Sequence, residues 1–246
     1  MREQGTIRYR CKACRRHFSI RTGTVLARSQ LPLTKWVLAV GLFKVGISAR
    51  ALAGELRISR RIAWALLHRI RDALATDVLM QPLHGEIELD DTYIGARRKG
   101  KRGRGAAHKT TVLGLKVRHG PVRSLVIPSL STADIHALLR THVARGARLY
   151  TDELPSYNKV RRLGYRHRRI LHLERFVRGQ THTQGIEGYW GHVKPTLVAR
   201  HRAVSPQHLQ RYLVEADIKH RFPKGRDFIA FVLTRLLANR SSLPTR

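Results

Sequence analysis

Acidic residues are scarce in this chain of 246 residues, and they are unevenly placed. Only 16 Asp and Glu stand against 48 Lys and Arg, and several of the acids crowd into EIELDD at 86–91 and TDE at 151–153. Carboxylates near a phosphate-binding surface repel phosphate unless they hold a cation that restores the charge balance. The alternative is that they pair with neighbouring Arg and Lys on a solvated strand. Their placement in the fold decides between the two.

The acids fall at positions from which they can converge. EIELDDTYI alternates, which predicts a strand with Glu86, Glu88 and Asp90 on one face. Asp152 ends a later strand, and Glu187 lies about one turn into a final helix. The predicted order is three strands, a helix that Ser131 can cap, a strand, a short helix at PSYNKVRRLG, a strand and a final helix. This is the order of a ribonuclease-H-like domain of the α/β (α+β) class. There the first and fourth strands are neighbours and the last helix packs across them.

Three converging carboxylates favour Mg²⁺ or Mn²⁺. Two such ions about 3.5–4 Å apart can activate a water or a 3′-hydroxyl and stabilise the departing oxygen of a phosphodiester. The predicted chemistry is therefore phosphoryl transfer on DNA. Lys194 follows Glu187 by seven positions and returns within about 20° of the same helical face, so it can hold a phosphate beside the metal. Pro195 predicts that this helix kinks or ends there.

The overall composition indicates a folded protein with a polyanionic partner. The formal net charge is +32, and the hydrophobic fraction of 42% is too high for a disordered basic tail. Double-stranded DNA is the expected partner. No run approaches the roughly 18 apolar residues of a membrane span, and the first residues do not resemble a signal peptide. We therefore expect a cytoplasmic protein associated with the nucleoid and no membrane partner.

Residues 31–80 have a helical pattern. Ser48 can cap one helix, and a turn at 57–59 leads into a second helix. Two helices joined by about three residues predict a helix-turn-helix, although an ordinary helical hairpin with exposed arginines is the alternative. The candidate DNA-binding residues of the second helix are Arg60, Arg61 and Arg69.

A Gly- and Lys/Arg-rich stretch, GARRKGKRGRGAAHK, follows the first strand. Such a sequence cannot build a core, and we expect a basic loop that contacts phosphates. The alternative is a flexible loop without a role in binding. The candidate DNA-binding residues are Arg97, Arg98, Lys99, Lys101, Arg102 and Arg104.

Five strings in order resemble one family along nearly the whole chain. They are RYRCKACRRHFSIRTGT, LPLTKW, ELDDTYIG, LYTDELPSY and HTQGIEGYWGHVKPTL. The chain resembles bacterial insertion-sequence transposases of the DDE type, in the subgroup with a zinc ribbon, a helix-turn-helix and a ribonuclease-H-like catalytic domain.

The resemblance assigns roles to individual residues. It makes Asp90, Asp152 and Glu187 the three catalytic, metal-binding carboxylates and Lys194 the basic residue that follows them. Asp91 stands where relatives often have Glu, as a neighbour of the site. Gln184 stands where relatives have Asn, which some related enzymes use as the third site residue, so Gln184 marks an alternative to Glu187.

The resemblance also implies a function. Such a transposase binds the terminal inverted repeats of its element, cleaves there and joins the 3′ ends to target DNA, as a homodimer or higher assembly on paired ends. Two alternatives stay open. One is a catalytically inactive DNA-binding remnant or repressor, and the other is a different ribonuclease-H-like nuclease, such as a junction resolvase.

The cysteines depart from the family pattern. A zinc ribbon needs four ligands, usually two CxxC pairs, and this chain has only Cys11 and Cys14, with His17 as a possible third ligand. We expect a half-site that holds zinc poorly. The predicted organisation is a truncated zinc ribbon at 1–30, the helix-turn-helix at 31–80, the catalytic domain at 84–204 and a helical tail at 205–246.

Three further residues lie near the predicted site. His172 and His182 flank the path to Glu187 and can contact the site, although basic surface histidines are commoner. Trp190 can stack on a base at the cut DNA end, but a core position is the stronger expectation.

Overall fold

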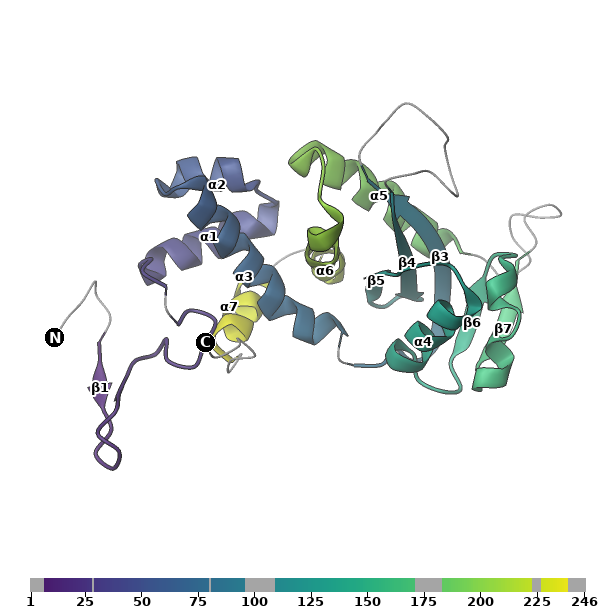
Figure 1. Cartoon of the computed structure of the whole chain (residues 1–246), viewed down its shortest axis with the longest axis horizontal. Coiled ribbons are helices and arrows are strands. Elements are labelled where there is room, and N and C mark those ends of the chain that lie inside the picture. The colour runs from purple at the N-terminus through teal and green to yellow at the C-terminus, as the bar shows by residue number, and fades with distance from the viewer. Residues whose placement is uncertain are drawn as a thin grey trace. The chain divides into compact units, whose positions relative to one another are not determined.

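The computed structural model describes residues 7–27, 29–79, 81–95, 109–170, 183–222 and 227–238 (Figure 1). The chain divides into two units, one of Met1–Leu74 with Lys224–Arg246 and one of Ala75–Pro223. The tail expected at 205–246 is therefore split, because its first helix belongs to the second unit and its last helix to the first.

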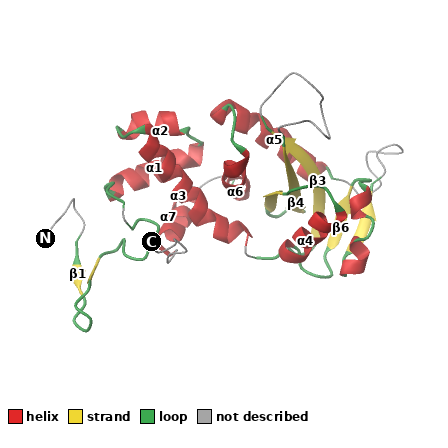
Figure 2. Ribbon diagram, in the orientation of Figure 1, coloured by secondary structure: helices red, strands yellow, loops and turns green. Residues whose placement is uncertain are grey.

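The second unit contains a five-stranded sheet with the order β5-β4-β3-β6-β7 (Figure 2). Strands β3, β4 and β5 form an antiparallel meander, and β6 and β7 run parallel to β3. The predicted adjacency of the first and fourth strands is confirmed, because β3 pairs with β6. The strands are β3 (Glu86–Ile94), β4 (Thr110–Val117), β5 (Val122–Val126), β6 (Arg148–Thr151) and β7 (Arg166–Arg169).

Helices cover both faces of this sheet. Helix α4 (Thr132–His142) packs on one face, where Leu113 and Leu115 meet Ile135. Helices α5 (Gln184–His201) and α6 (Pro206–Arg221) pack on the other face, where Val112 meets Ile186. Alternate residues of β4 therefore supply two separate cores, as the pleat of a strand requires.

Two local predictions in this unit have different outcomes. The Ser131 cap of α4 is confirmed, since its Oγ accepts a 3.1 Å hydrogen bond from the Asp134 N–H. The short helix expected at PSYNKVRRLG is wrong, because the segment forms two 3₁₀ turns, η1 (Pro155–Tyr157) and η2 (Val160–Leu163). Gly164 ends the second turn with a φ of 88°, too soon for an α-helix to develop.

The first unit is helical, with α1 (Leu33–Val45), α2 (Ala49–Leu56), α3 (Arg60–Leu79) and α7 (Phe228–Ala238). The Ser48 cap of α2 is confirmed, because its Oγ accepts from the Ala51 N–H at 3.2 Å. Three residues join α2 to α3, as the sequence predicts. Helix α7 packs on α1, where the rings of Phe43 and Phe228 stack 6.2 Å apart.

A small hairpin precedes these helices. Strand β1 (Tyr9–Arg10) pairs antiparallel with β2 (His17–Phe18), and Cys11 and Cys14 lie in the turn between them. Among the helices that the structure describes, none combines the length and apolar character needed to cross a membrane.

Candidate active site

Asp90 lies where α5 comes closest to the sheet. Its partner across the strands is Gly114 of β4. A Cβ at Gly114 would lie 2.5 Å from Trp190 Cζ2 and 2.7 Å from Ile186 Cδ1, both on α5. Only glycine therefore lets the helix that carries Glu187 approach Asp90 this closely. Sequence reasoning missed Gly114, although an isolated glycine within a strand can signal such an approach.

Glu88 anchors the start of α5. Its side chain is 2% exposed, and its Oε2 accepts a 2.9 Å hydrogen bond from the Ile186 N–H. Its Oε1 lies 3.3 Å from Arg118 Nε. A Cβ at Gly185 would lie 2.7 Å from Glu88 Oε2, so this position also requires glycine. The sequence placed Glu88 on the face of Asp90 but gave no sign of this anchoring role.

Two members of the acidic segment pair with arginine, as the alternative interpretation predicts, although Glu88 is buried and does not lie on a solvated strand. Glu86 pairs with Arg148 at 2.6 Å and with Arg118 at 3.3 Å, and Glu88 shares Arg118. These carboxylates are neutralised by arginine and contribute to the fold, in contrast to the electrostatics of Asp90 described below.

Asp152 is presented at the carboxyl end of β6, directly after buried Thr151. Its Oδ1 accepts a 3.0 Å hydrogen bond from the Leu154 N–H, which turns the chain away from the sheet. His167 Nε2 lies 2.8 Å from the Thr151 hydroxyl, while burial and the charges of Arg161 and Arg169 lower the pKa of His167 to about 4. A neutral imidazole thus supports the strand end.

Glu187 stands in the first turn of α5, as predicted, with its side chain exposed. The Thr183 hydroxyl donates a 2.6 Å hydrogen bond to Glu187 Oε1. This contact spans one helical turn and holds the carboxylate near the start of the helix, where the helix dipole favours negative charge.

Charge interactions connect the predicted site residues. Burial raises the pKa of Asp90 to about 7, and the carboxylates of Asp91, Asp152 and Glu187 add to the increase. Lys194 acts in the opposite direction. Burial lowers the pKa of Lys194, and the nearby carboxylates of Asp90 and Asp91 oppose that change. Groups from β3, from the end of β6 and from α5 thus lie close enough to interact through their charges, and a cation between them would relieve the repulsion.

The donor set fits a hard divalent cation, because all three groups are carboxylates and the site carries surplus negative charge. Within the described ranges, however, no three His, Cys, Asp or Glu side chains gather closely enough to hold a metal ion. The carboxylates therefore interact through charge at their present spacing, and ligation would draw them closer. Cys11 and Cys14 likewise form no group with a third such ligand among the described residues. Hydrogen bonds from Cys14 and Ala13 lower the pKa of the Cys11 thiol.

Helix α5 continues through Pro195 to His201, so it does not end at Pro195, one of the two predicted outcomes. Proline cannot donate a backbone hydrogen bond. The bond missing here is the one to the Gly191 carbonyl, and buried Val193 and Leu197 hold both sides of the proline to the core. The next residue, Thr196, adds a 2.8 Å hydrogen bond from its hydroxyl to the His192 carbonyl. Lys194 consequently stays on the same helix as Glu187.

The remaining predicted residues have varied positions. Trp190 is 3% exposed within the core, which confirms the core interpretation. Arg60 and Arg61 are exposed at the start of α3. Gln184 is exposed at the first position of α5. The following residues lie outside the described ranges: Arg97, Arg98, Lys99, Lys101, Arg102, Arg104, His172 and His182.

Arg69 has a structural position that differs from the predicted DNA contact. Its guanidinium donates to the carbonyls of Val25 and Ala27 and lies over the ring of Trp36, 5.5 Å from the centroid. The side chain joins the segment before α1 to α3. Helical spacing alone could not reveal that this arginine points inward.

Residues 82–220 match the model of the ISXO2-like transposase domain, and this range contains all four predicted catalytic residues. The chain belongs to this transposase family. The transposase is 30% identical over 226 residues to a protein of the transposable element ISH50 from Halobacterium salinarum, covering 84% of this chain and 76% of that one. It is 27% identical over 96 residues to a transposase-like protein of Haemophilus influenzae, covering 39% and 77% of the two chains.

Solved structures with weaker similarity include two from DNA-recombining proteins. The catalytic core of BIV integrase has a TM-score of 0.38 and 14% identity, covering 55% of the transposase and 84% of that chain. A chain of the pre-cleavage Mos1 transpososome has a TM-score of 0.35 and 12% identity, covering 85% and 79%. The family assignment rests on the sequence match, and it makes the chain an insertion-sequence transposase of the DDE type.

Proposed function

We propose that this transposase binds the terminal inverted repeats of its own insertion sequence, cleaves the DNA there and joins the 3′ ends to target DNA. The catalytic residues are Asp90, Asp152 and Glu187. The observation that carries the proposal is electrostatic, because Asp152 and Glu187 act on the pKa of Asp90 from two other elements of the fold. Residues far apart in the sequence thus contribute to one acidic site in a chain of net charge +32.

The same three carboxylates would hold Mg²⁺ or Mn²⁺. When bound, the metal supplies Lewis-acid activation of the attacking hydroxyl and stabilises the leaving oxygen. Asp90 would lose its proton on becoming a ligand, because a bound cation would offset the burial and the carboxylate repulsion that raise its pKa. Lys194 holds a phosphate oxygen of the DNA at the edge of the site.

DNA recognition in this proposal falls to the helical unit. Arg60 and Arg61 are exposed at the start of α3, the second helix after the three-residue turn, and would contact phosphates or base edges. The Gly- and Lys/Arg-rich stretch at 95–109 would add sequence-independent phosphate contacts. Two or more copies would assemble on paired ends, since each element has two ends to be joined.

The experiment is cleavage and joining of DNA that carries the gene's own flanking sequences, with and without Mg²⁺. The parent should form joined products only with the cation, and Asp152→Asn should form none. Asp134→Asn makes the same change at a half-buried carboxylate of α4, which accepts a hydrogen bond from the Ser129 hydroxyl, and it should leave joining intact.

The outcomes separate this proposal from its rivals. A DNA-binding repressor would bind the ends and cut nothing, with or without the three carboxylates. A structure-specific nuclease would cut branched DNA but join no strands. Equal nicking by the parent and Asp152→Asn would show that the activity does not belong to this site.

A further inference from the structure

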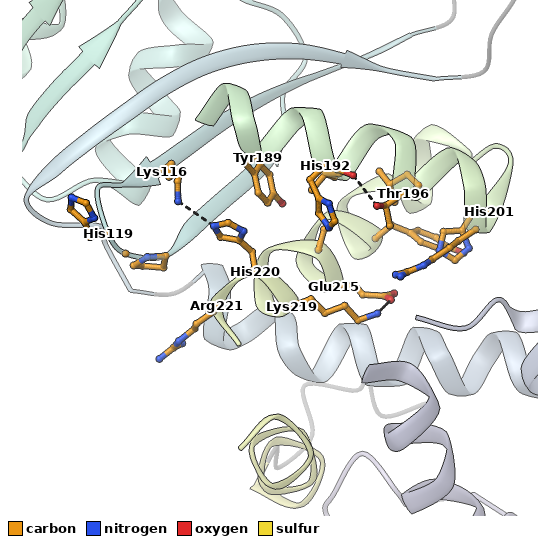
Figure 3. Close-up of a pocket in the computed structure, with 17 residues that line it drawn as sticks. Lys116, His119, Tyr189, His192, Thr196, His201, Glu215, Lys219, His220 and Arg221 are labelled. Carbon is orange, nitrogen blue, oxygen red and sulfur yellow. Dashed lines mark hydrogen bonds and ion pairs between the residues drawn. The ribbon is translucent and has the colours of Figure 1, made fainter. Parts of the chain in front are cut away.

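A cavity of about 790 Å³ lies between α5, α6 and the turn that joins β4 to β5 (Figure 3). One wall is a ridge of α5 formed by His192, Thr196 and Arg200, which repeat every four residues. Glu187 and Lys194 do not line this cavity, although they belong to the same helix. The cavity is therefore separate from the acidic site but attached to it through α5.

The lining of the cavity is strongly cationic. It contains one acidic residue, Glu215, which is buried and pairs with Lys219. The basic lining residues are Lys116, His119, His192, Arg200, His201, Lys219, His220 and Arg221. Such a surplus of one sign within a concave surface attracts an anion.

Two of the basic residues, Lys116 and His220, contact each other. Lys116 Nζ lies 3.1 Å from His220 Nε2. Burial lowers the pKa of His220, and the charges of Lys116 and His192 lower it further. The imidazole of His220 therefore stays neutral and can accept from the Lys116 ammonium, which contributes positive charge to the cavity.

A second wall is apolar and carries aromatic rings. Val193 and Leu197 are buried along it, and the ring of Tyr212 meets that of His201 edge-on at 4.6 Å. The ring of Tyr189 meets His220 at 5.2 Å. A simple inorganic anion would leave this wall unused, whereas a ligand with a phosphate and a flat apolar group would use both walls.

The size of the cavity limits what enters. Its volume falls in the range of pockets that enclose a small organic molecule, about 300–1,000 Å³. The bases of an intact duplex stay stacked and paired, so a duplex presents only its backbone to such a surface. An unpaired nucleotide can insert its base, and single-stranded nucleic acid is bound in this way by cationic grooves with aromatic side chains.

We propose that this cavity binds an unpaired nucleotide of a DNA strand, with its phosphate against the basic residues and its base against Tyr212 and the apolar wall. The inference rests on the proposed function, because the DNA end brings the strand to α5. His192 follows Glu187 by five residues, a rise of about 7.5 Å along the helix. A strand held in this cavity is thus within reach of the acidic site. The cavity would give that strand a second contact on the same helix.

The test measures binding of dye-labelled oligothymidylate and of a blunt duplex by fluorescence anisotropy, in chelator and without divalent cation. The double variant His192→Ala/Arg200→Ala removes two exposed side chains of the α5 ridge. We expect its affinity for the single strand to fall about tenfold, because the phosphate loses two basic partners on α5. Duplex affinity should change about twofold or less.

The matched control is Arg166→Ala/Arg168→Ala, which removes two exposed arginines from β7, outside the cavity. It should weaken single-strand binding by about twofold or less. Equal losses in the two double variants would overturn the proposal, because the effect would then follow net charge. An equal loss for duplex and single strand in the ridge variant would also overturn it.

Insertion of the base is tested with Tyr212→Leu, which keeps an apolar side chain but removes the ring. The parent should bind an abasic strand more weakly than oligothymidylate, and Tyr212→Leu should bind the two alike. A parent that binds both strands equally would contradict base insertion. Thermal unfolding identifies any variant that fails to fold. Because binding is measured without divalent cation, a failure here is distinct from a failure of the joining assay.

Discussion

The Ile186 N–H donates a 2.9 Å hydrogen bond to the buried carboxylate of Glu88. Glu88 lies two residues before Asp90 on the same face of β3, and Ile186 directly precedes Glu187 on α5. One contact between residues 98 positions apart therefore holds the start of α5 to β3, and with it the two elements that carry the proposed first and third catalytic carboxylates.

Replacement of Glu88 tests this anchoring role. Glu88→Ala removes the acceptor of the Ile186 N–H and leaves Arg118, which is 12% exposed, without this partner. Breaking a buried pair costs about 3–5 kcal/mol, so the free energy of unfolding should fall by that order. Glu88→Gln keeps an acceptor oxygen and should recover part of the stability.

The readout that separates positioning from stability is the Mg²⁺ concentration for half-maximal joining, measured well below the melting temperature. It should rise in both Glu88 variants and more in Glu88→Ala. An unchanged Mg²⁺ requirement in a destabilised but folded Glu88→Ala would show that Glu88 supports the fold without placing Glu187.

Gly114→Ala should push α5 away from the sheet, because the new Cβ would lie 2.5 Å from the Trp190 ring. Overpacking of this kind costs about 1–3 kcal/mol, and joining should fall together with the melting temperature. Gly54→Ala in α2 is the control, since nothing lies within 4 Å of the added Cβ and helical alanine is favoured. A melting temperature of Gly114→Ala equal to that of the parent would refute the close approach.

The Mg²⁺ requirement should depend on pH. Burial and the neighbouring carboxylates raise the pKa of Asp90 to about 7, so below that pH a proton competes with the metal for this group. The apparent Mg²⁺ affinity should improve by about tenfold per pH unit up to pH 7 and level off above it. Magnesium titrations of joining across this range measure it, and a flat profile below pH 7 would contradict the proton competition.

Stability of the metal-free protein should show the opposite trend. Because its pKa is raised, Asp90 binds more protons in the folded protein than in the unfolded protein. The stability that this protonation contributes is present below the ordinary pKa of Asp90, near 3.8. It is lost as pH rises toward 7. Asp90→Asn should remove this part of the pH dependence in chelator-treated protein, as denaturant unfolding can show.

The arginines of α3 should separate into two classes. Arg69→Ala should destabilise the helical unit, because it removes the donors to the Val25 and Ala27 carbonyls. Arg60→Ala and Arg61→Ala should leave unfolding unchanged, weaken DNA binding and reduce the salt dependence of the binding constant by about one ion each. Unfolding curves and salt titrations distinguish the classes, and a loss of stability in Arg60→Ala would contradict the division.

The sequence predicted what local patterns control. Alternation along EIELDDTYI placed Asp90 on a strand, and the order of elements placed Asp152 and Glu187 near it. The contacts of Glu88, Gly114 and Arg69 were not predictable in the same way, because each depends on a partner distant in the chain. The helix does not end at Pro195 for a related reason, since the burial of Val193 and Leu197 outweighs the local cost of proline in α5.

The most direct test of the metal-dependent chemistry is joining by Asp90→Cys in Mg²⁺ and in Mn²⁺. A thiolate is a poor ligand for Mg²⁺ and a better one for the softer Mn²⁺. If Asp90 binds the catalytic metal, the variant should be inactive in Mg²⁺ and partly active in Mn²⁺, while the parent joins strands in both. Full joining by Asp90→Cys in Mg²⁺ would show that Asp90 is not a metal ligand and would contradict the proposed site.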